Sequence, residues 1–260
     1  MTCISTKDLN IAYGNLEIVK DLNLNIPKGK ITTIIGANGC GKSTILKTIA
    51  RIIKAKSGTI SVNGMEIGKQ DSRELAKSMA VLPQSPQAPS GLTVEELIAY
   101  GRFPHQKGFG KLKSEDKDII NWALEVTGIS EFKERAIDAL SGGQRQRAWI
   151  AMALAQETDI LLLDEPTTYL DLAHQLEILK LLEELNKKQG RTIVMVIHEL
   201  NNAARFADHM IGVKKGKIVC EGTAHEVMTN ENLKEIFNID ATIVEDPKTG
   251  KPVCLTYDMA

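Results

Sequence analysis

The sequence lacks the features of several protein classes. None of its apolar runs approaches the roughly 18 residues that a membrane-spanning helix needs. Its formal net charge of −1 gives no electrostatic reason to expect nucleic acid as the main partner. Lys107, Lys111 and Lys113 form a small basic cluster, which we interpret as a solvated loop. With 43% hydrophobic and 25% charged residues, the 260-residue chain has the composition of an ordinary globular protein.

The cysteines lack the spacing of a metal site or a redox pair. They are Cys3, Cys40, Cys220 and Cys254, and we expect free thiols in a reducing cytoplasm. Residues 1–5 have neither a basic nor an apolar segment of the kind found in signal peptides, so we expect none. Any work at a membrane is therefore expected from the cytoplasmic face, through a partner.

Three short aliphatic runs predict strands that are buried on both faces of a parallel sheet. They are residues 31–35, 160–163 and 193–197, which lead into Gly36, Asp164 and His198. In open α/β sheets, ligands bind at the carboxyl ends of the strands. All three strand ends carry residues suited to a phosphate site, so we expect them to contribute to one site.

Between about residues 92 and 156 the pattern changes to helix. Thr93 and Glu96 predict a capping box, and Ser114 is expected to cap a further helix that Gly128 ends. This region is interpreted as a helical insertion in the sheet domain. No internal repeat is present, so the chain is expected to hold one nucleotide site.

Residues 36–43 fit the complete phosphate-loop pattern G-x-x-x-x-G-K-[ST]. Glycines allow successive backbone N–H groups to point at phosphate oxygens, and a helix that starts near Lys42 adds its positive dipole end. Lys42 is expected to reach the β- and γ-phosphates, and Ser43 to ligate Mg²⁺. The alternative is a chance glycine-rich turn. The predicted nucleotide-binding residues of this segment are Gly36, Ala37, Asn38, Gly39, Cys40, Gly41, Lys42, Ser43 and Thr44.

Two acidic residues follow the second aliphatic run. Asp164 is the expected anchor for Mg²⁺, and Glu165 can polarise a water molecule for in-line attack on the γ-phosphorus. The alternative interpretation is that the pair caps a helix. Beside a complete phosphate loop, we favour the catalytic interpretation.

A second candidate anion site begins at Ser141. Ser141 and Gln144 form a capping-box pattern around Gly142 and Gly143, and a helix follows. The simpler interpretation is a well-capped helix with flexible glycines. The alternative is a second phosphate-binding helix N-terminus, in which glycine backbone and a serine hydroxyl face a ligand.

Residues 140–144, Leu-Ser-Gly-Gly-Gln, resemble the signature of ABC-type ATPases. They lie between the phosphate loop and the Asp164-Glu165 strand, as in that family, and the resemblance covers roughly residues 4–225. It implies an α/β fold: a P-loop NTPase core of ABC type with a mainly parallel sheet, an antiparallel β subdomain and an inserted helical subdomain. We expect a single ABC ATPase domain over residues 1–260, with the core at about 1–88 and 157–225, the helical subdomain at about 89–156 and a C-terminal extension at about 226–260.

The C-terminal extension has a weaker pattern than the rest of the chain. From about residue 222 the sequence is less regular, and residues 245–250 predict a turn.

Four further positions match the family in order: Tyr13, Gln84, Asp171 and His198. The resemblance implies that Tyr13 stacks on adenine, that Gln84 senses Mg²⁺ and the attacking water, and that His198 contacts the γ-phosphate. Asp171 is expected to cross a dimer interface. Without the resemblance, Tyr13 would be interpreted as a strand-face aromatic and Gln84 as an ordinary loop glutamine. His198 would be interpreted as a structural histidine and Asp171 as a helix cap.

The family arrangement also implies partners. Each signature serves the phosphate loop of the other subunit, so a homodimer is expected to enclose two ATP molecules with their Mg²⁺. Two membrane permease subunits and an extracytoplasmic substrate-binding protein complete the implied machine, with this chain peripheral at the cytoplasmic face of the cell membrane. Residues 91–105 lie where the family docks its permease, and Leu92 or Phe103 is either exposed there or buried in the helical core.

Several segments resemble the ATP-binding subunits of iron-siderophore, haem and cobalamin importers. They are residues 101–105, 166–171 and 246–252. We expect a ferric siderophore as the cargo, with haem, cobalamin or a metal ion as alternatives. A soluble ABC ATPase of the iron–sulfur assembly type is a rival function. A DNA-repair or chromosome-organising ATPase is disfavoured, because no sustained heptad pattern exists.

Overall fold

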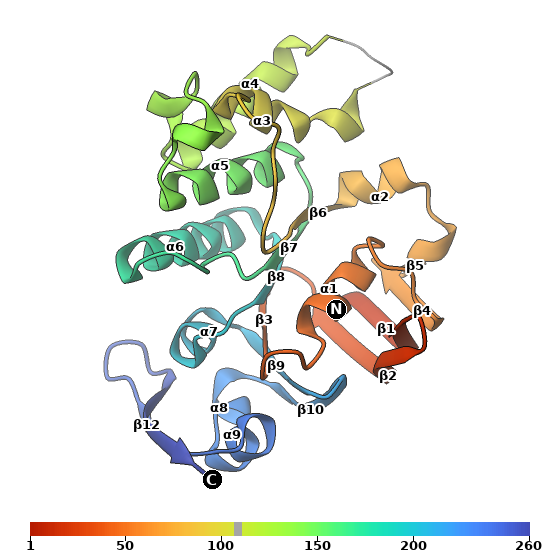
Figure 1. The fold of residues 1–260 in the computed structure, drawn as a ribbon, viewed down its shortest axis with the longest axis vertical. Coiled ribbons are helices and arrows are strands. Elements are labelled where there is room, and N and C mark those ends of the chain that lie inside the picture. The colour runs from red at the N-terminus through yellow and green to blue at the C-terminus, as the bar shows by residue number, and fades with distance from the viewer. Residues whose placement is uncertain (107–110) are drawn as a thin grey trace. The chain divides into compact units, whose positions relative to one another are not determined.

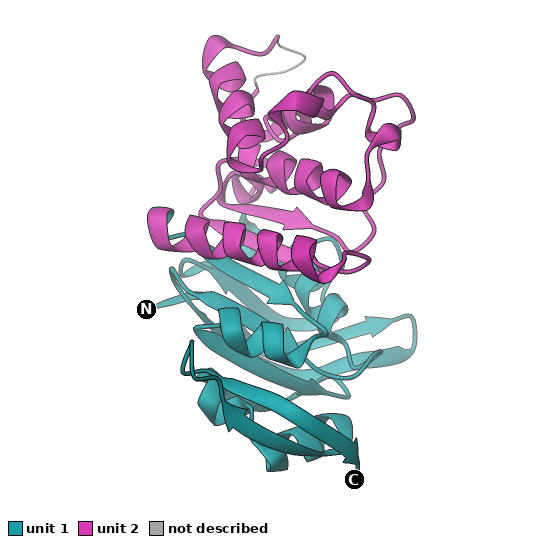
Figure 2. Ribbon diagram, turned by 90° about the vertical axis from the view of Figure 1, so that its left-hand side faces the viewer, with its two compact units in different colours: residues 1–70, 189–260 teal, residues 71–188 magenta. Residues whose placement is uncertain are grey.

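The computed structural model describes residues 1–106 and 111–260, which divide into two compact units (Figure 2). Unit 1 comprises residues 1–70 and 189–260, and unit 2 comprises residues 71–188. Lys107 of the basic cluster lies outside the described residues, whereas Lys111 and Lys113 are exposed.

The first sheet of unit 1 is antiparallel, with its strands in the order β2-β1-β4-β5 (Figure 1). These strands are β1 (Thr2–Tyr13), β2 (Leu16–Pro27), β4 (Ser57–Val62) and β5 (Met65–Glu66). Ile4 lies opposite Ile26 on β2 and Val62 on β4, and all three side chains are buried. This sheet is the antiparallel β subdomain implied by the family resemblance.

The second set of strands in unit 1 has the order β10-β9-β3-β8. The strands are β3 (Ile31–Ile35), β8 (Thr192–Val196), β9 (His209–Lys214) and β10 (Lys217–Gly222). β3 is parallel to β8 and β9, and every residue of β3 and β8 is buried, as the aliphatic runs predicted. Three helical segments accompany them: α1 (Lys42–Ile49), a 3₁₀ turn (Ile67–Lys69) and α7 (Leu200–Phe206).

The tail beyond residue 222 is more regular than the sequence indicated. It forms α8 (Ala224–Val227), α9 (Asn230–Phe237) and an antiparallel hairpin of β11 (Ile239–Glu245) and β12 (Pro252–Met259). The expectation of a less regular tail is therefore wrong. Thr223 and Glu226 form a capping box at α8, and the Thr229 side chain caps α9. The turn predicted at residues 245–250 does connect the two strands.

Unit 2 is mainly helical. Its elements are α2 (Ser72–Ser78), β6 (Met79–Leu82), α3 (Val94–Tyr100), a 3₁₀ turn (Phe103–His105), α4 (Ser114–Val126), two more 3₁₀ turns (Ser130–Phe132 and Ile137–Ala139), α5 (Gly142–Ala155), β7 (Ile160–Asp164) and most of α6 (Leu172–Gln189). β6 and β7 are parallel, with Leu82 opposite Leu163. The predicted helical subdomain, residues 89–156, lies within this unit, and its boundaries stay a prediction. Within the described residues, no helix has both the length and the apolar character needed to cross a membrane.

The helix ends of unit 2 follow local capping rules. The capping box of Thr93 and Glu96 forms at α3, as predicted. The predicted cap of α4 by Ser114 is wrong, because Ser114 is already helical and Lys113 precedes it as the capping residue. The Lys113 backbone N–H donates instead to Asp116 Oδ2 at 2.9 Å.

A buried arginine, Arg102, connects α4 with the end of α5 in unit 2. Arg102 Nε lies 2.9 Å from Asp116 Oδ1, and Nη1 donates to the Ala155 carbonyl and to Glu157 Oε2, each at 2.7 Å. Burial acts to raise the pKa of Asp116, but the hydrogen bonds from Lys113 N–H and from Arg102 outweigh it and hold this pKa below its ordinary value.

Candidate functional site

The phosphate loop of unit 1 is shaped by glycine. Gly36 has φ +154°, and a Cβ at this position would lie 2.3 Å from the Val213 carbonyl oxygen, so no larger residue fits. Gly41 has φ +106° and precedes α1 without any side-chain cap. The N-terminus of α1 has no side-chain cap, and the helix dipole favours an anion there.

Lys42 is folded back onto this loop. Its ammonium donates to the carbonyl oxygens of Gly36 at 2.8 Å and Ala37 at 3.0 Å, and the residue is only 5% exposed. Cys40 is also buried, with its Sγ 3.9 Å from Lys42 Nζ. Two loop carbonyls therefore hold the Lys42 ammonium in place.

The register of unit 1 brings His198 to the same edge as this loop. Ile34 on β3 lies opposite Val196 on the parallel strand β8. Gly36 and His198 each follow two residues beyond that pair, and His198 is exposed. Tyr13 is the last residue of β1 and is 51% exposed.

In unit 2 the parallel pairing of β6 and β7 brings Gln84 and Glu165 together. Each lies two residues beyond the Leu82–Leu163 pair. Gln84 Nε2 donates to Glu165 Oε2 at 2.5 Å, and Thr168 Oγ1 donates to the same oxygen at 3.0 Å. Glu165 is 8% exposed and has φ +55°. Its carboxylate is therefore positioned by two side-chain donors.

The segment 140–144 begins α5 as a capped helix. Ser141 Oγ accepts the Gln144 N–H at 3.3 Å, and Gln144 Oε1 accepts the Ser141 N–H at 3.0 Å. The capping box is thus present, while Gly142 and Gly143 leave the first turn without side chains. Ser141 and Gly142 are exposed, and Gly143 is buried.

Asp171 caps α6. Its Oδ1 accepts the His174 N–H at 2.9 Å and lies 2.8 Å from His174 Nδ1. The His174 backbone N–H, followed by the His174 ring, holds the pKa of Asp171 below its ordinary value. The carboxylate is therefore ionised at neutral pH.

The chemistry of the predicted Mg²⁺ ligands fits the ion. Ser43 supplies a hydroxyl, Asp164 a carboxylate that is 1% exposed, and Gln84 an amide, and Mg²⁺ prefers such oxygen ligands. Among the residues that the structure describes, no group of three or more His, Cys, Asp or Glu side chains forms a different metal site.

Two residues of unit 2, Thr168 and His174, contact predicted site residues, and the sequence does not indicate these contacts. The sequence pattern includes Thr168 only within residues 166–171, which mark the family branch, and it assigns no role to His174. The parallel strand ends at Gln84 and Glu165 could have drawn attention to Thr168, three residues further along the chain. The contact of His174 with Asp171 is local, whereas its contact with Gly143 joins two segments that no local pattern connects.

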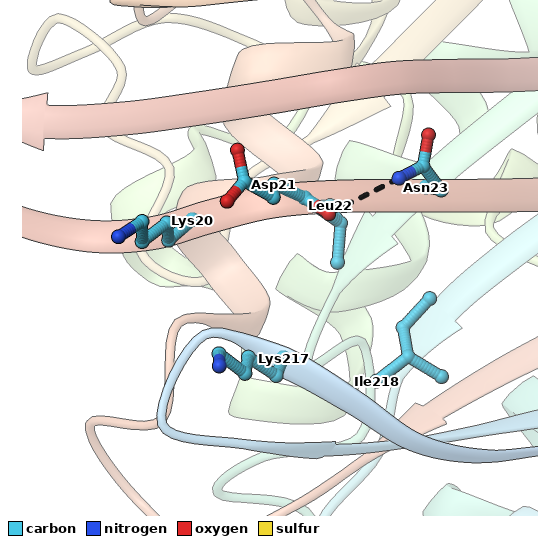
Figure 3. Close-up of a pocket in the computed structure, with 6 residues that line it drawn as sticks. All are labelled: Lys20, Asp21, Leu22, Asn23, Lys217 and Ile218. Atoms are coloured by element: carbon cyan, nitrogen blue, oxygen red, sulfur yellow. Dashed lines mark hydrogen bonds between the residues drawn. The ribbon is translucent and has the colours of Figure 1, made fainter.

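Two surface features lie outside the predicted nucleotide residues. A pocket of about 290 Å³ in unit 1 is lined by Lys20, Asp21, Leu22, Asn23, Lys217 and Ile218 (Figure 3). Asn23 Nδ2 donates to the Asp21 carbonyl beside it at 3.2 Å. In unit 2, Phe103 is 70% exposed and borders a groove of about 310 Å³ with Leu92 and Tyr100. Of the two residues expected to be either exposed or buried in the helical core, Phe103 is exposed and Leu92 is half-buried.

Comparison with known proteins gives consistent matches. The family profile described as ABC transporter matches residues 19–168. The chain is 66% identical over 259 residues to the iron(3+)-hydroxamate import ATP-binding protein FhuC of Bacillus subtilis (strain 168), covering 100% of this chain and 96% of that protein. A metal-chelate type ABC transporter in an inward-facing conformation aligns with a TM-score of 0.84 at 31% identity over 98% of both chains.

A second solved structure contains nucleotide. It is the dimeric post-hydrolysis state of the ATP-binding cassette MJ0796 bound to ADP and Pi, with a TM-score of 0.75 and 31% identity. The alignment covers 85% of this chain and 98% of that one.

Proposed function

This chain belongs to the ABC transporter family, and we propose that it is the ATP-hydrolysing subunit of a membrane importer for ferric siderophores of the hydroxamate type. The observation that carries the proposal is its similarity to the iron(3+)-hydroxamate import protein, because 66% identity extends over the whole chain and 96% of that relative. Similarity confined to the ATPase core would not indicate which cargo is imported. Here the similarity also covers the C-terminal extension at about residues 226–260.

In the proposed reaction, residues 36–44 bind the phosphates of ATP. Lys42 exchanges its bonds to the carbonyls of Gly36 and Ala37 for bonds to phosphate oxygens. Ser43, Gln84 and Asp164 would hold Mg²⁺, and the bound ion would neutralise charge on the phosphates. Tyr13 stacks on the adenine ring, and its half-exposed side chain supports this role.

Glu165 is the proposed base that positions and activates the attacking water. Its hydrogen bonds to Gln84 and Thr168 support this role, since they fix the carboxylate before the reaction. Gln84 would orient the attacking water and contribute to the Mg²⁺ site, and His198 would contact the γ-phosphate. Hydrolysis then needs no covalent intermediate: water attacks phosphorus, the bond to ADP breaks, and the carboxylate accepts the proton.

A complete site is proposed to need two chains. One chain carries one phosphate loop and one signature segment, so residues 141–144 act on the ATP bound by the partner, and Asp171 crosses the interface. The dimeric state of the MJ0796 cassette with ADP and Pi supports this arrangement. Two permease subunits bind near residues 91–105, where Phe103 is exposed. An extracytoplasmic binding protein delivers the cargo, nucleic acid has no part, and the chain acts from the cytoplasmic face.

Uptake by cells tests the proposal. Cells that lack the gene are complemented with the wild type, with Lys42→Ala, or with Lys54→Ala as a matched control, since Lys54 is an exposed lysine just beyond α1. Uptake of radiolabelled iron bound to a hydroxamate siderophore is compared with uptake of haem and cobalamin. The wild type and Lys54→Ala are expected to restore ferric hydroxamate uptake, whereas Lys42→Ala is not.

The other outcomes assign a different function. A defect confined to haem or cobalamin would show that the cargo is wrong. Unchanged uptake of all three, together with failure to co-purify with a permease, would contradict the transporter role and favour a soluble assembly ATPase.

A further inference from the structure

The signature segment and Asp171 meet at one side chain, His174. The His174 ring lies in the first turn of α6, 2.8 Å from Asp171 Oδ1 through Nδ1. Gly143, the second residue of α5, borders the same ring. A Cβ built on Gly143 would lie 2.8 Å from His174 Cδ2 and 3.2 Å from Cγ. The ring is therefore held by Asp171 while it also contacts the backbone of Gly143.

The two glycines of the signature differ in their surroundings. Neither needs a left-handed backbone, so conformation alone does not demand glycine at either position. A Cβ on Gly142 would meet only the Tyr169 carbonyl oxygen, at 4.0 Å, which is an ordinary contact. A Cβ on Gly143 would overlap an imidazole that is anchored at its other side. The absence of a side chain at Gly143 thus makes room for His174.

We propose that His174 is a positioning residue that couples Asp171 to the N-terminal turn of α5. The inference rests on the proposed function, in which residues 141–144 and Asp171 act across a dimer interface. The ring is hydrogen-bonded to Asp171 on one side and lies against Gly143 on the other, so the position of Asp171 affects the contact at the start of α5. Two segments that act at the interface are thereby aligned within one chain before the partner binds.

Asp171 suits the role of an anchor. Oδ1 accepts both the His174 N–H, at 2.9 Å, and the Nδ1–H of the ring. The first bond fixes the carboxylate relative to α6, and the second fixes the ring relative to the carboxylate. The low pKa of Asp171 keeps this acceptor charged at neutral pH.

Thermal unfolding of the full chain tests the contact without nucleotide. Gly143→Ala is expected to lower the melting temperature by about 2–12 °C, because overpacking of this kind usually has a cost of that size for a chain of this length. His174→Ala in the same chain removes the ring and should recover more than half of that loss. Gly142→Ala is the matched control, and His174→Ala should not rescue it. Equal losses from Gly143→Ala with and without His174 would overturn the proposal.

Steady-state ATP hydrolysis by the assembled transporter tests the positioning role. His174→Ala is expected to lower kcat about 10- to 100-fold with KM for ATP unchanged, because misplacement of a reacting group costs rate more than binding. His174→Asn keeps a donor near the position of Nδ1, and His174→Phe keeps a ring against Gly143. Each should recover part of the lost kcat, and wild-type kcat in His174→Ala would refute the role.

The two proposals fail in different ways. If the wild-type transporter neither hydrolyses ATP nor imports ferric hydroxamate, the proposed function fails, while the melting temperatures still decide whether His174 and Gly143 are in contact. If the wild type is active and the unfolding losses are additive, only the inference about His174 fails.

Discussion

Replacing Glu165 by glutamine removes the charge of the proposed base and keeps its shape. A positioned base contributes about 10²–10⁴ to a rate, so ATP turnover is expected to fall by that factor. This corresponds to about 2.7–5.4 kcal/mol in the activation barrier. ATP should still bind, because the change leaves the phosphate loop of residues 36–44 intact. The variant should therefore accumulate as an ATP-bound dimer.

The cost of this change to the folded chain is smaller. Glu165 Oε2 accepts one hydrogen bond from Gln84 and one from Thr168. A hydrogen bond to a charged group contributes about 1.5–3 kcal/mol, against about 0.5–1.5 for a neutral one, so the two bonds together weaken by about 2 kcal/mol. A domain with a free energy of unfolding of about 5–15 kcal/mol stays almost fully folded after such a loss. Unfolding therefore cannot account for a fall in turnover of 100-fold or more.

The assay is phosphate release by the reconstituted transporter at saturating ATP, with nucleotide binding and gel filtration measured in parallel. Glu177→Gln serves as the control, because it removes the charge that pairs with Arg147 in the same unit but has no proposed role in the reaction. This control should keep wild-type turnover. If Glu165→Gln also hydrolysed ATP at a rate within about tenfold of the wild type, the assignment of the base would be refuted.

Two further predictions concern the phosphate loop and the buried ion pair. Mg·ATP at 100 times its dissociation constant should raise the melting temperature by about 5–11 °C. Lys42→Ala should abolish most of that rise, which is measured against each variant's own nucleotide-free value because Lys42 also binds two loop carbonyls. Asp116→Asn should lower the free energy of unfolding by about 1–3 kcal/mol at pH 7, less than for an isolated buried charge because Arg102 keeps other acceptors. The folded-state pKa of Asp116 is lowered, so its contribution is present above the unfolded pKa of about 3.9 and is lost as the pH falls through the folded value. The difference between wild type and Asp116→Asn in urea unfolding should therefore shrink below about pH 4, and a constant difference would contradict the pair's role.

Elements whose signals are local in the chain could be predicted from the sequence. The aliphatic run at 31–35 forms β3, and the run at 193–197 forms β8 except for its last residue; all residues of both runs are buried. The run at 160–163 forms β7, which is extended to Asp164. Capping boxes at Thr93 and Ser141 were also correct, because they depend on residues only three positions apart.

Features that depend on distant contacts could not be predicted in this way. Arg102 is buried because it meets an acidic residue on α4 and a carbonyl at the end of α5, and neither is indicated by its neighbours in sequence. The contact of His174 with Gly143 joins the starts of α6 and α5, which are separated in sequence by the rest of α5 and by β7.

Glu165 has a backbone conformation that its neighbours in the sequence do not predict. Pro166 follows, and a proline disfavours the right-handed helical conformation of the residue before it. An extended conformation would satisfy this rule, but Glu165 adopts φ +55° instead, which costs about 1–2 kcal/mol for a residue with a side chain. The Thr168 N–H donates to the Glu165 carbonyl at 3.2 Å, and the bonds from Gln84 and Thr168 hold the carboxylate, so three contacts oppose the strain. Glutamine at this position carries the same backbone strain as glutamate. A loss of turnover in Glu165→Gln therefore reports on the carboxylate charge and not on the conformation of the loop.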